Sequence, residues 1–260
     1  MSDPRADRPP IGALAVIVPA HDEALLLPRA LDALHTAAGH PALHGVALSL
    51  VVAADLCRDD TAAIARTAGA DVVEVSARNA GIARHAAIRH ALRRLGTPES
   101  ATWIATTDAD SRVPPDWLAH QLAQAAHGWD AVVGTVDVTV WPASYPAGAQ
   151  TRYTADYRRA ASRSPHAHPH VHGANLGLSA RAYRAVGGFP PLASGEDVAL
   201  VARLDRARFR VLRTTACPVD TSARFAGRAP GGFSAHLRRL AGTHPPVLEP
   251  DPSLTSRRVT

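Results

Sequence analysis

The sequence predicts an α/β fold with a mostly parallel central sheet flanked by helices on both faces. Short apolar runs without polar alternation recur along the chain, and most are followed by a segment whose apolar residues are spaced three and four apart. Unbroken apolar runs are typical of strands buried on both faces, and the wider spacing is typical of helices. Strands and helices that alternate in this way form parallel sheets, because right-handed crossovers carry the chain back over the sheet.

The first part of the chain shows this alternation most clearly. The run ALAVIVP at 13–19 ends at a proline and predicts the first strand, and Leu27, Leu31 and Leu34 predict a helix by their spacing. Glycine closes the next two helical segments, as is common after the last turn of a helix. The further elements expected here are a strand at 46–54, a helix at 59–69, a strand at 71–75, a helix at 79–96 and a strand at 102–107.

Beyond Asp110 the alternation loosens. The run SRSPHAHPHVHG is rich in histidine and low in complexity, and we expect it to be a mobile loop near the functional site. The elements expected in this part are a helix at 115–128, a strand at 131–140, a helix at 151–162, a loop entering a short strand at 168–179, a helix at 195–207 and a strand at 209–213.

These elements predict one domain made of two unequal halves, residues 11–112 and residues 113–242. The remaining segments, 1–10 and 243–260, are rich in Pro, Ser, Asp and Arg and have no apolar periodicity. We therefore expect a disordered tail at the start and a flexible tail at the end.

The composition favours a small anionic ligand. The net charge is +5, the pI is near 10.0, and all 28 basic residues are arginine. The arginines are scattered and aromatic residues make up only 5%, so the pattern does not favour a nucleic-acid surface. A small molecule that bears phosphate suits the charge better.

The same composition indicates a cytoplasmic chain. No run approaches the roughly 18 apolar residues of a membrane span, so we expect no transmembrane segment. The N-terminus MSDPRADRPP lacks the layout of a signal peptide. Peripheral attachment at the inner membrane surface stays open. Cys57 and Cys217 have no close spacing, which predicts reduced thiols.

Polar side chains follow four successive predicted strands. Ligands bind at the carboxyl ends of the strands in open parallel sheets, because loops and helix N-termini meet there. The groups at these ends are His21 to Glu23, Asp55 to Asp60, Arg78 with Asn79, and Asp108 with Asp110.

Asp108 and Asp110 are the candidate metal ligands. Carboxylates two apart on an extended segment point the same way, and hard oxygen ligands suit Mg²⁺ or Mn²⁺ bound partly through phosphate oxygens. A solvated turn is the alternative for this pair taken alone. Its position after a buried strand, beside other acidic strand ends, favours the metal site.

Six segments taken in order resemble the family 2 glycosyltransferases, nucleotide-sugar enzymes with the GT-A (Rossmann-like) fold. The resemblance covers roughly residues 12–213, and each motif alone is loose. It implies a nucleotide-sugar-binding first half and an acceptor-binding and catalytic second half. The segments are VIVPAHDEALLLPRAL, VVAADLCRDDTAAIA, NAGIARHAAIRHA, TDADSRVPPDWL, HGANLGLSARAYRAVGGF and GEDVALVARL.

The resemblance implies a nucleotide site on the first half. Asp55 matches an acidic residue that accepts a hydrogen bond from the base, although Ala54 stands where the family usually has a second acid. Asp108 matches the DxD residue near the ribose and Asp110 the one on the metal. Further matches on the nucleotide and diphosphate side are Pro19, Ala20, Glu23, Arg78, Asn79 and Arg84.

The resemblance also implies that Asp197 of the ED motif, beside Glu196, is the general base. An inverting transfer needs a carboxylate to take the proton of the attacking hydroxyl. Capping of the following helix by these two acids is the alternative reading.

The remaining candidates come from two glycine-containing loops. We expect Gly173 and Asn175 to approach the donor sugar or acceptor, while His172 is either a ligand-binding or metal-binding residue or a solvated side chain. Arg224 and Arg228 lie in a Gly/Pro-rich loop and suit bidentate contact with phosphate, an ordinary surface loop being the alternative. His236 is a weaker metal candidate.

The predicted function is therefore transfer of a sugar from a nucleoside diphosphate sugar, a UDP- or GDP-sugar, to a hydroxyl of a small or lipid-linked acceptor. We expect inversion at the anomeric carbon and a divalent cation, Mg²⁺ or Mn²⁺, at the diphosphate. Two alternatives stay open. One is a retaining transferase resembling glucosyl-3-phosphoglycerate synthase, and the other is a nucleotide-sugar-binding module without catalysis.

Overall fold

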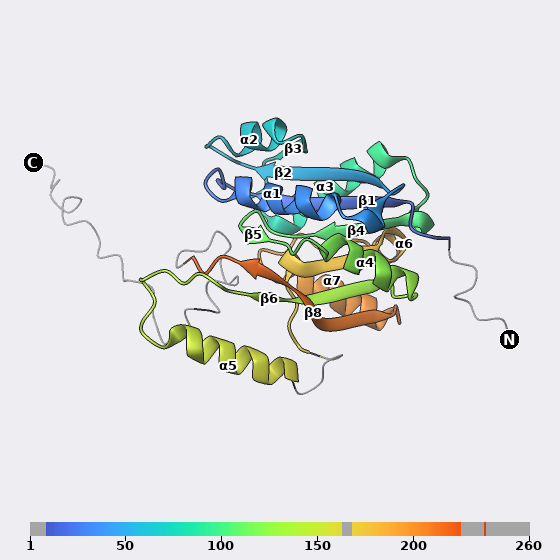
Figure 1. Ribbon diagram of the computed structural model, residues 1–260. Helices are drawn as coiled ribbons and strands as arrows, with labels where there is room; N and C mark the ends of the chain where they lie inside the picture. The colour runs from blue at the N-terminus through green and yellow to red at the C-terminus, as the bar shows by residue number, and fades with distance from the viewer. Residues whose placement is uncertain (1–8, 163–167, 225–236, 238–260) are drawn as a thin grey trace, which may run out of the picture.

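The part of the chain that the structure describes is built on one eight-stranded sheet with helices on both faces (Figure 1). The computed structural model describes residues 9–162, 168–224 and 237. The strand order is β3-β2-β1-β4-β7-β6-β8-β5. The sheet and its helical layers confirm the predicted α/β class, with the second half of the sheet less parallel than the first.

Strands β3, β2, β1 and β4 form a parallel block, as predicted. Strand β1 pairs in parallel with both β2 and β4, and β2 pairs with β3. The bounds of the elements in this block are β1 Ala13–Ala20, α1 Leu27–Ala38, β2 Ala47–Asp55, α2 Thr61–Thr67, β3 Asp71–Val75, α3 Ala80–Leu95 and β4 Thr102–Thr106.

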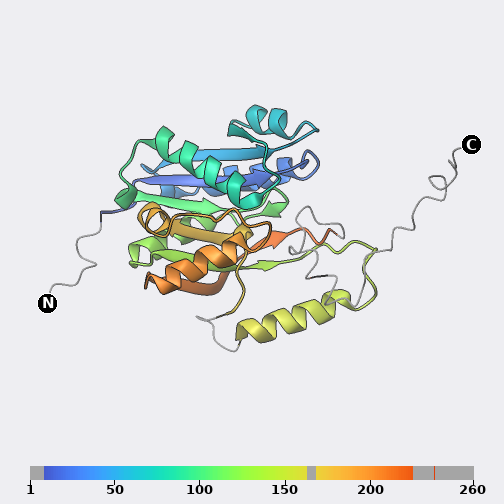
Figure 2. The same cartoon turned by 180° about the vertical axis from the view of Figure 1, so that it is seen from behind.

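Alternate residues of β1 face two different apolar layers, which explains the unbroken apolar run. Leu14 and Val16 pack against one face with α1, α2 and α4, whereas Ala15 and Ile17 pack against the other with α3, α6 and α7. Figure 1 shows α1 and α4 in front of the sheet. Figure 2, which views the molecule from the other side, shows α3 and α7 in front of it. Burial on both faces leaves no position in the strand for a polar side chain.

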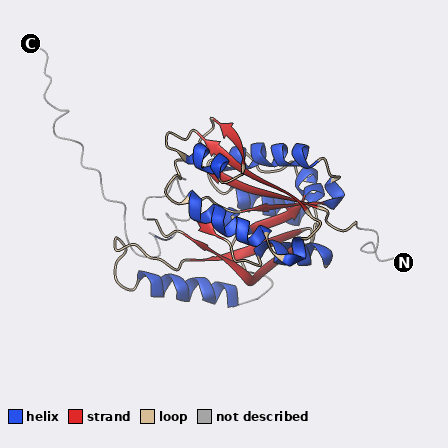
Figure 3. Ribbon diagram, turned by 45° about the horizontal axis from the view of Figure 1, so that its top comes forward, coloured by secondary structure: helices blue, strands red, loops and turns tan. Residues whose placement is uncertain are grey.

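The second half completes the sheet, whose strands are red in Figure 3, and its strands pair in mixed directions. Strand β7 is antiparallel to β4 and β6, and β8 is parallel to β6 and antiparallel to β5. The bounds are β5 Ser111–Arg112, α4 Trp117–Ala126, β6 Ala131–Asp137, α5 Ala149–Ser162, β7 Leu176–Ser179, α6 Ala180–Ala185, α7 Glu196–Arg206 and β8 Val211–Thr221.

Three features of this half differ from the sequence expectations. Strand β8 continues to Thr221 instead of ending near residue 213. Pro218 argues against a strand in this segment, but pairing with β6 and β5 holds it in the sheet. Strand β5 has only two residues and depends on this tertiary pairing. Helix α6 is too short to show periodicity; the signal for it is Ser179, whose hydroxyl accepts the N–H of Ala182.

Helix α5 stands apart from the two main layers and packs on a third, smaller apolar cluster (Figures 1 and 2). Tyr153 and Tyr157 of the helix meet Val136 and Val138 there. No helix among the described residues is long and apolar enough to cross a membrane. The expected tails, the middle of the histidine-rich run, Arg228 and His236 lie wholly or largely outside the described residues.

Candidate active site

A cleft of about 520 Å³ opens at the carboxyl ends of β1, β2, β3 and β4, the edge that the sequence predicts. Residues of the second half close it from the opposite side. The predicted site residues on its walls are Pro19, Ala20, Glu23, Asp55, Arg78, Asn79, Arg84, Asp108, Asp110, His172, Gly173, Glu196, Asp197 and Arg224.

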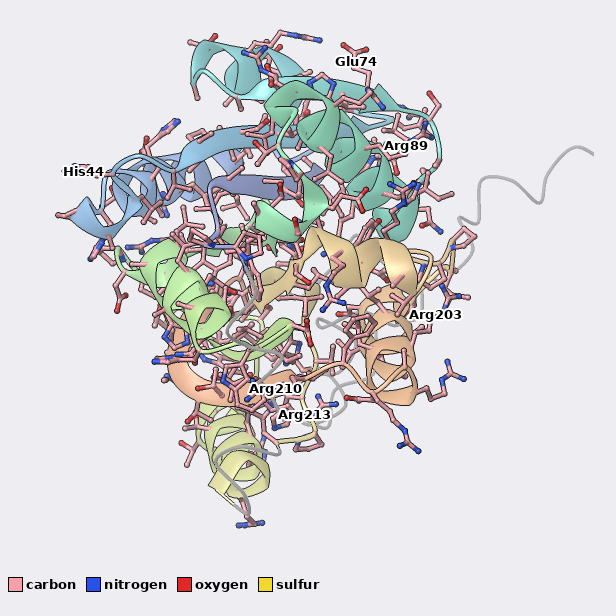
Figure 4. All side chains as sticks on the ribbon, turned by 90° about the vertical axis from the view of Figure 1, so that its right-hand side faces the viewer. His44, Glu74, Arg89, Arg203, Arg210 and Arg213 are labelled. Carbon is pink, nitrogen blue, oxygen red and sulfur yellow. The ribbon has the colours of Figure 1, made fainter. Side chains whose placement is uncertain are left out.

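The cleft is acidic although the whole chain is basic. Among the described residues, six carboxylates and three guanidinium groups line it, which leaves three formal negative charges. Arg89, Arg203, Arg210 and Arg213, labelled in Figure 4, lie outside its walls. The excess of arginine therefore does not neutralise the site, and the cleft can attract a cation.

Arg84 connects the two halves at the bottom of the cleft. Its side chain is only 3% exposed, and its guanidinium donates to Asp108 after β4 and to Glu196 at the start of α7. Its Nε donates to the hydroxyl of Thr106 at 3.1 Å. A buried guanidinium with carboxylate partners on both sides fixes the distance between the DxD and ED motifs.

The two DxD carboxylates have different partners. Asp108 accepts from Arg84, yet desolvation, helped by the charges of Asp110, Glu196 and Asp197, raises the pKa of Asp108 to about 6. A cation that binds the ionised form of Asp108 therefore competes with a proton when the pH falls toward this pKa. Asp110 instead pairs with Arg224, which follows β8.

Asp110 shares the guanidinium of Arg224 with Glu23. Nε and Nη2 of Arg224 both donate to Oδ2 of Asp110, the Nε contact being 3.0 Å, and Nη1 lies 2.7 Å from Oε1 of Glu23. All three side chains are largely buried. The arginine of the predicted phosphate-binding loop thus rests on the carboxylate of the predicted metal ligand.

Asp197 is held at the N-terminus of α7. The preceding Gly195 has φ of +76°, a left-handed conformation that glycine adopts readily. The carboxylate accepts the N–H of Gly173 at 2.7 Å and that of Val198 at 2.8 Å. Burial and the charge of Glu196 raise its pKa, against the effect of Arg84. A carboxylate with a raised pKa is a stronger base.

Asp55 is largely occupied by the protein's own backbone. Its two oxygens accept the N–H groups of Ala77, Arg78 and Asn79 at 2.7–2.9 Å. Arg78 has φ of +46°, and this left-handed turn directs three successive N–H groups at one carboxylate. Three of its roughly four acceptor positions are used, so contact with a nucleobase is left to the remaining one.

His172 belongs to a row of aromatic rings that the sequence did not predict to lie together. The backbone N–H of Val136 donates to the hydroxyl of Tyr157, which lies 3.1 Å from Nε2 of His172. His170 stacks on Tyr157 with ring centroids 3.9 Å apart, and both histidines line the cleft. Tyr157 was missed; the alternation of histidines at 168, 170 and 172 was the available signal, because it puts them on one side of an extended segment.

The expected ligand contact of Asn175 is wrong. Its amide donates to the carbonyl oxygens of Thr135 and Cys217, and its oxygen accepts the indole N–H of Trp117. The side chain is 1% exposed and does not line the cleft. It ties β6, β8 and α4 together instead. Nearby, Gly173 lines the cleft, and its N–H donates to Asp197.

A separate group of ligand-type side chains lies near the first strand ends. Asp22, Cys57 and Asp59 each have a candidate ligand atom within 4.8 Å of the others. The chain itself already uses these carboxylates: Asp22 accepts the N–H of Arg58, and Asp59 that of Ala24. We therefore assign this group to loop packing. Both cysteines are free thiols, as predicted.

Comparison with solved structures identifies proteins of similar fold. A mannosyltransferase from Pyrobaculum calidifontis, in complex with GDP-Man and Mn²⁺, is similar with a TM-score of 0.60 and 22% identity, covering 88% of this chain and 69% of the other. Glucosyl-3-phosphoglycerate synthase from Mycobacterium tuberculosis, with Mn²⁺, UDP and glucosyl-3-phosphoglycerate, has a TM-score of 0.51 and 19% identity, covering 93% and 83%. No curated protein sequence matches the chain. The chain therefore has the fold of these GT-A glycosyltransferases.

The sequence itself gives the narrower assignment. The profile described as "Glycosyl transferase family 2" matches residues 15–187, more than half of the chain. The chain belongs to glycosyl transferase family 2.

Proposed function

We propose that the protein transfers a hexose from a nucleoside diphosphate sugar to an acceptor hydroxyl, with inversion at the anomeric carbon. The observation that carries this proposal is the presence of Asp108, Asp110 and Asp197 on the walls of one cleft in a family 2 glycosyltransferase. The first two come from the first half and the third from the second half. A donor on one wall then faces an acceptor on the other.

The residues present fit a divalent cation. The described residues of the cleft have three surplus negative charges, and Asp110 and Asp108 offer hard oxygen ligands. Two neighbours by fold were solved with Mn²⁺. When bound, such an ion neutralises charge that develops on the departing diphosphate. The chain's own contribution at this wall is to hold Asp108 through Arg84.

Asp197 takes the proton of the acceptor hydroxyl in this proposal. The hydroxyl oxygen attacks the anomeric carbon, the bond from that carbon to the diphosphate oxygen breaks, and the proton moves to the Asp197 carboxylate. The N–H groups of Gly173 and Val198 hold the carboxylate for this step. His172, fixed by Tyr157, lies on the same wall and is proposed to contact the acceptor or sugar.

The nucleotide is proposed to lie over the ends of β1 to β3. Pro19, Ala20, Arg78 and Asn79 line this part of the cleft. The side-chain oxygen of Asn79 accepts the N–H of Ile82 and its amide donates to Leu192, so Asn79 acts on the nucleotide mainly by shaping the loop.

A thermal-shift screen tests donor binding. UDP-, GDP- and TDP-sugars are compared with and without Mn²⁺, because a ligand that binds only the native state raises the melting temperature. We expect one nucleotide class to raise it and Mn²⁺ to increase the effect. No shift with any donor, together with no release of nucleoside diphosphate, would refute the proposed function.

Retention is the second candidate, favoured by the similarity to glucosyl-3-phosphoglycerate synthase. The anomeric configuration of the product, measured by proton NMR, distinguishes the two outcomes. A product with the donor's configuration removes Asp197 as the base of a single displacement.

A further inference from the structure

Arg224 occupies the position where a cation is expected to bind. Its guanidinium is clamped between Oδ2 of Asp110 and Oε1 of Glu23, with three of its nitrogen atoms engaged. The carboxylates come from segments far apart in the chain, after β1 and after β4. The carboxylates of Asp110 and Glu23, which contact the same guanidinium through different nitrogen atoms, form a site that favours a positive charge, called here the cation seat.

This seat can hold one cation at a time. A guanidinium remains protonated at any ordinary pH, and a divalent ion needs direct contact with carboxylate oxygens at about 2.0–2.2 Å. Oδ2 of Asp110 already accepts two N–H groups of Arg224. An ion that takes this oxygen must therefore displace the guanidinium, since two positive charges at this distance repel one another.

We propose that Arg224 is an internal counter-ion that a divalent cation displaces from Asp110 and Glu23, so that Glu23 becomes a further carboxylate of the cation seat. This inference rests on the proposed function. The displaced guanidinium stays at the cleft wall, because its backbone N–H donates to the hydroxyl of Ser222. It is then available to the diphosphate of the donor. The metal alone should therefore bind weakly, and the metal with nucleotide should bind tightly.

Binding of Mn²⁺ to the full chain tests the exchange without any measurement of turnover. Free Mn²⁺ is followed by electron paramagnetic resonance for the wild type, Arg224→Gln and Arg184→Gln. Arg184 makes a surface ion pair with Glu99 and lies outside the cleft walls, so its variant controls for the loss of one positive charge. We expect Arg224→Gln to bind Mn²⁺ at least about tenfold more tightly than the wild type, and Arg184→Gln to stay within about twofold.

Two further variants test the partners. Adding Glu23→Gln to Arg224→Gln should reverse most of the gain, because the seat then loses a carboxylate. Arg224→Lys keeps the charge but has a single ammonium group, which cannot bridge as the guanidinium does, and should bind Mn²⁺ with intermediate affinity. It replaces Arg224→Gln as the decisive variant if the glutamine variant fails to fold by circular dichroism.

The nucleotide separates this inference from the proposed function. With saturating UDP or GDP, the wild type should gain affinity for Mn²⁺, whereas Arg224→Gln should gain less and bind the nucleotide more weakly. Folded Arg224 variants that bind Mn²⁺ alone no more tightly than the wild type would overturn the exchange, even if donors bind and turn over. Failure of every donor to bind would instead refute the proposed function, while the affinities for Mn²⁺ alone still decide the exchange.

Discussion

At the scale of single residues, the site depends on carboxylates whose environments differ. Asp197 and Asp108 have raised pKa values, while Asp55 is held by three backbone N–H groups. The same type of side chain therefore has three roles: Asp197 is the proposed base, Asp108 a proposed cation ligand and Asp55 a structural anchor. The neighbours of each carboxylate, and not its position in a motif, decide which role it takes.

Asp197→Asn tests the proposed base. The change keeps the shape and one of the two acceptor oxygens, but an amide does not take up a proton, so we expect kcat to fall by about 10²–10⁴-fold. Donor binding, measured by thermal shift, should be retained. Asp205→Asn on the exposed side of the same helix, where the carboxylate pairs with Arg213, is the control and should leave kcat unchanged. Normal turnover by Asp197→Asn would remove the assignment.

Arg84→Met tests the buried connection between the two motifs. The substitution leaves Glu196 without its guanidinium partner in a buried position, and removal of one member of a buried ion pair costs about 3–5 kcal/mol of unfolding free energy. Urea unfolding measures the loss. The surface variant Arg66→Met, which breaks an exposed pair with Glu74, should cost no more than about 1 kcal/mol. Equal costs for the two variants would argue against the connecting role.

At the scale of elements, the turn between β3 and α3 is the most clearly specified part of the cleft. Asp55 gathers three N–H groups of this turn, and Asn79 caps α3 by accepting the N–H of Ile82. The turn places Arg78 on the wall of the cleft where the nucleotide is proposed to bind. One carboxylate at the end of β2 thus sets the shape of the loop after β3.

Asp55→Asn should loosen this turn. The amide replaces one acceptor oxygen by a donor that faces backbone N–H groups, and unmet buried donors cost about 1–3 kcal/mol. Urea unfolding is expected to show a loss in this range. Asp32→Asn, on the exposed side of α1, is the matched control and should stay within about 0.5 kcal/mol of the wild type. A loss no larger than the control's would contradict the anchoring role.

The parallel block could be predicted from the sequence, and much of the second half could not. Runs such as ALAVIVP are apolar throughout because they are covered on both faces, so local pattern and final position agree. Strand β8 and the two-residue β5 exist through pairing between distant segments, which leaves no periodic signal. The same holds for the site. The acids at the strand ends could be predicted, because ligands bind at the carboxyl ends of parallel strands. The burial of the Asn175 side chain and the ion pairs of Arg224 depend on tertiary packing.

At the scale of the whole molecule, the two halves meet where β4 pairs with β7, and the cleft lies across that junction. Asp108 and Asp110 are supplied by one half, Asp197 and Arg224 by the other. Any condition that loosens the second half therefore affects both walls of the site. His168 is a titratable group of that half whose surface is fully buried, and it lies beside the carbonyl oxygens of Val133 and Thr214.

The pH dependence of stability should reflect His168. Burial lowers the pKa of His168 below its ordinary value of 6.5, as it does for His85 and His120. As the pH falls through 6.5, the unfolded chain takes up protons that the folded chain refuses, so each such histidine reduces stability by up to about 1.4 kcal/mol per pH unit. The raised pKa values of Asp108 and Asp197 act in the opposite direction, because the folded chain binds their protons first.

A variant isolates the histidine contribution from this opposing effect. His168→Gln keeps an N–H donor for the two carbonyl groups but does not titrate, so its stability should fall less than that of the wild type between pH 7.5 and 5. Urea unfolding at several pH values measures the difference, and His44→Gln at an exposed position reports the effect of removing any one histidine. If wild type and His168→Gln lose stability in parallel, His168 is protonated inside the folded protein, and the hydrogen bonds to Val133 and Thr214 offset the cost of its burial.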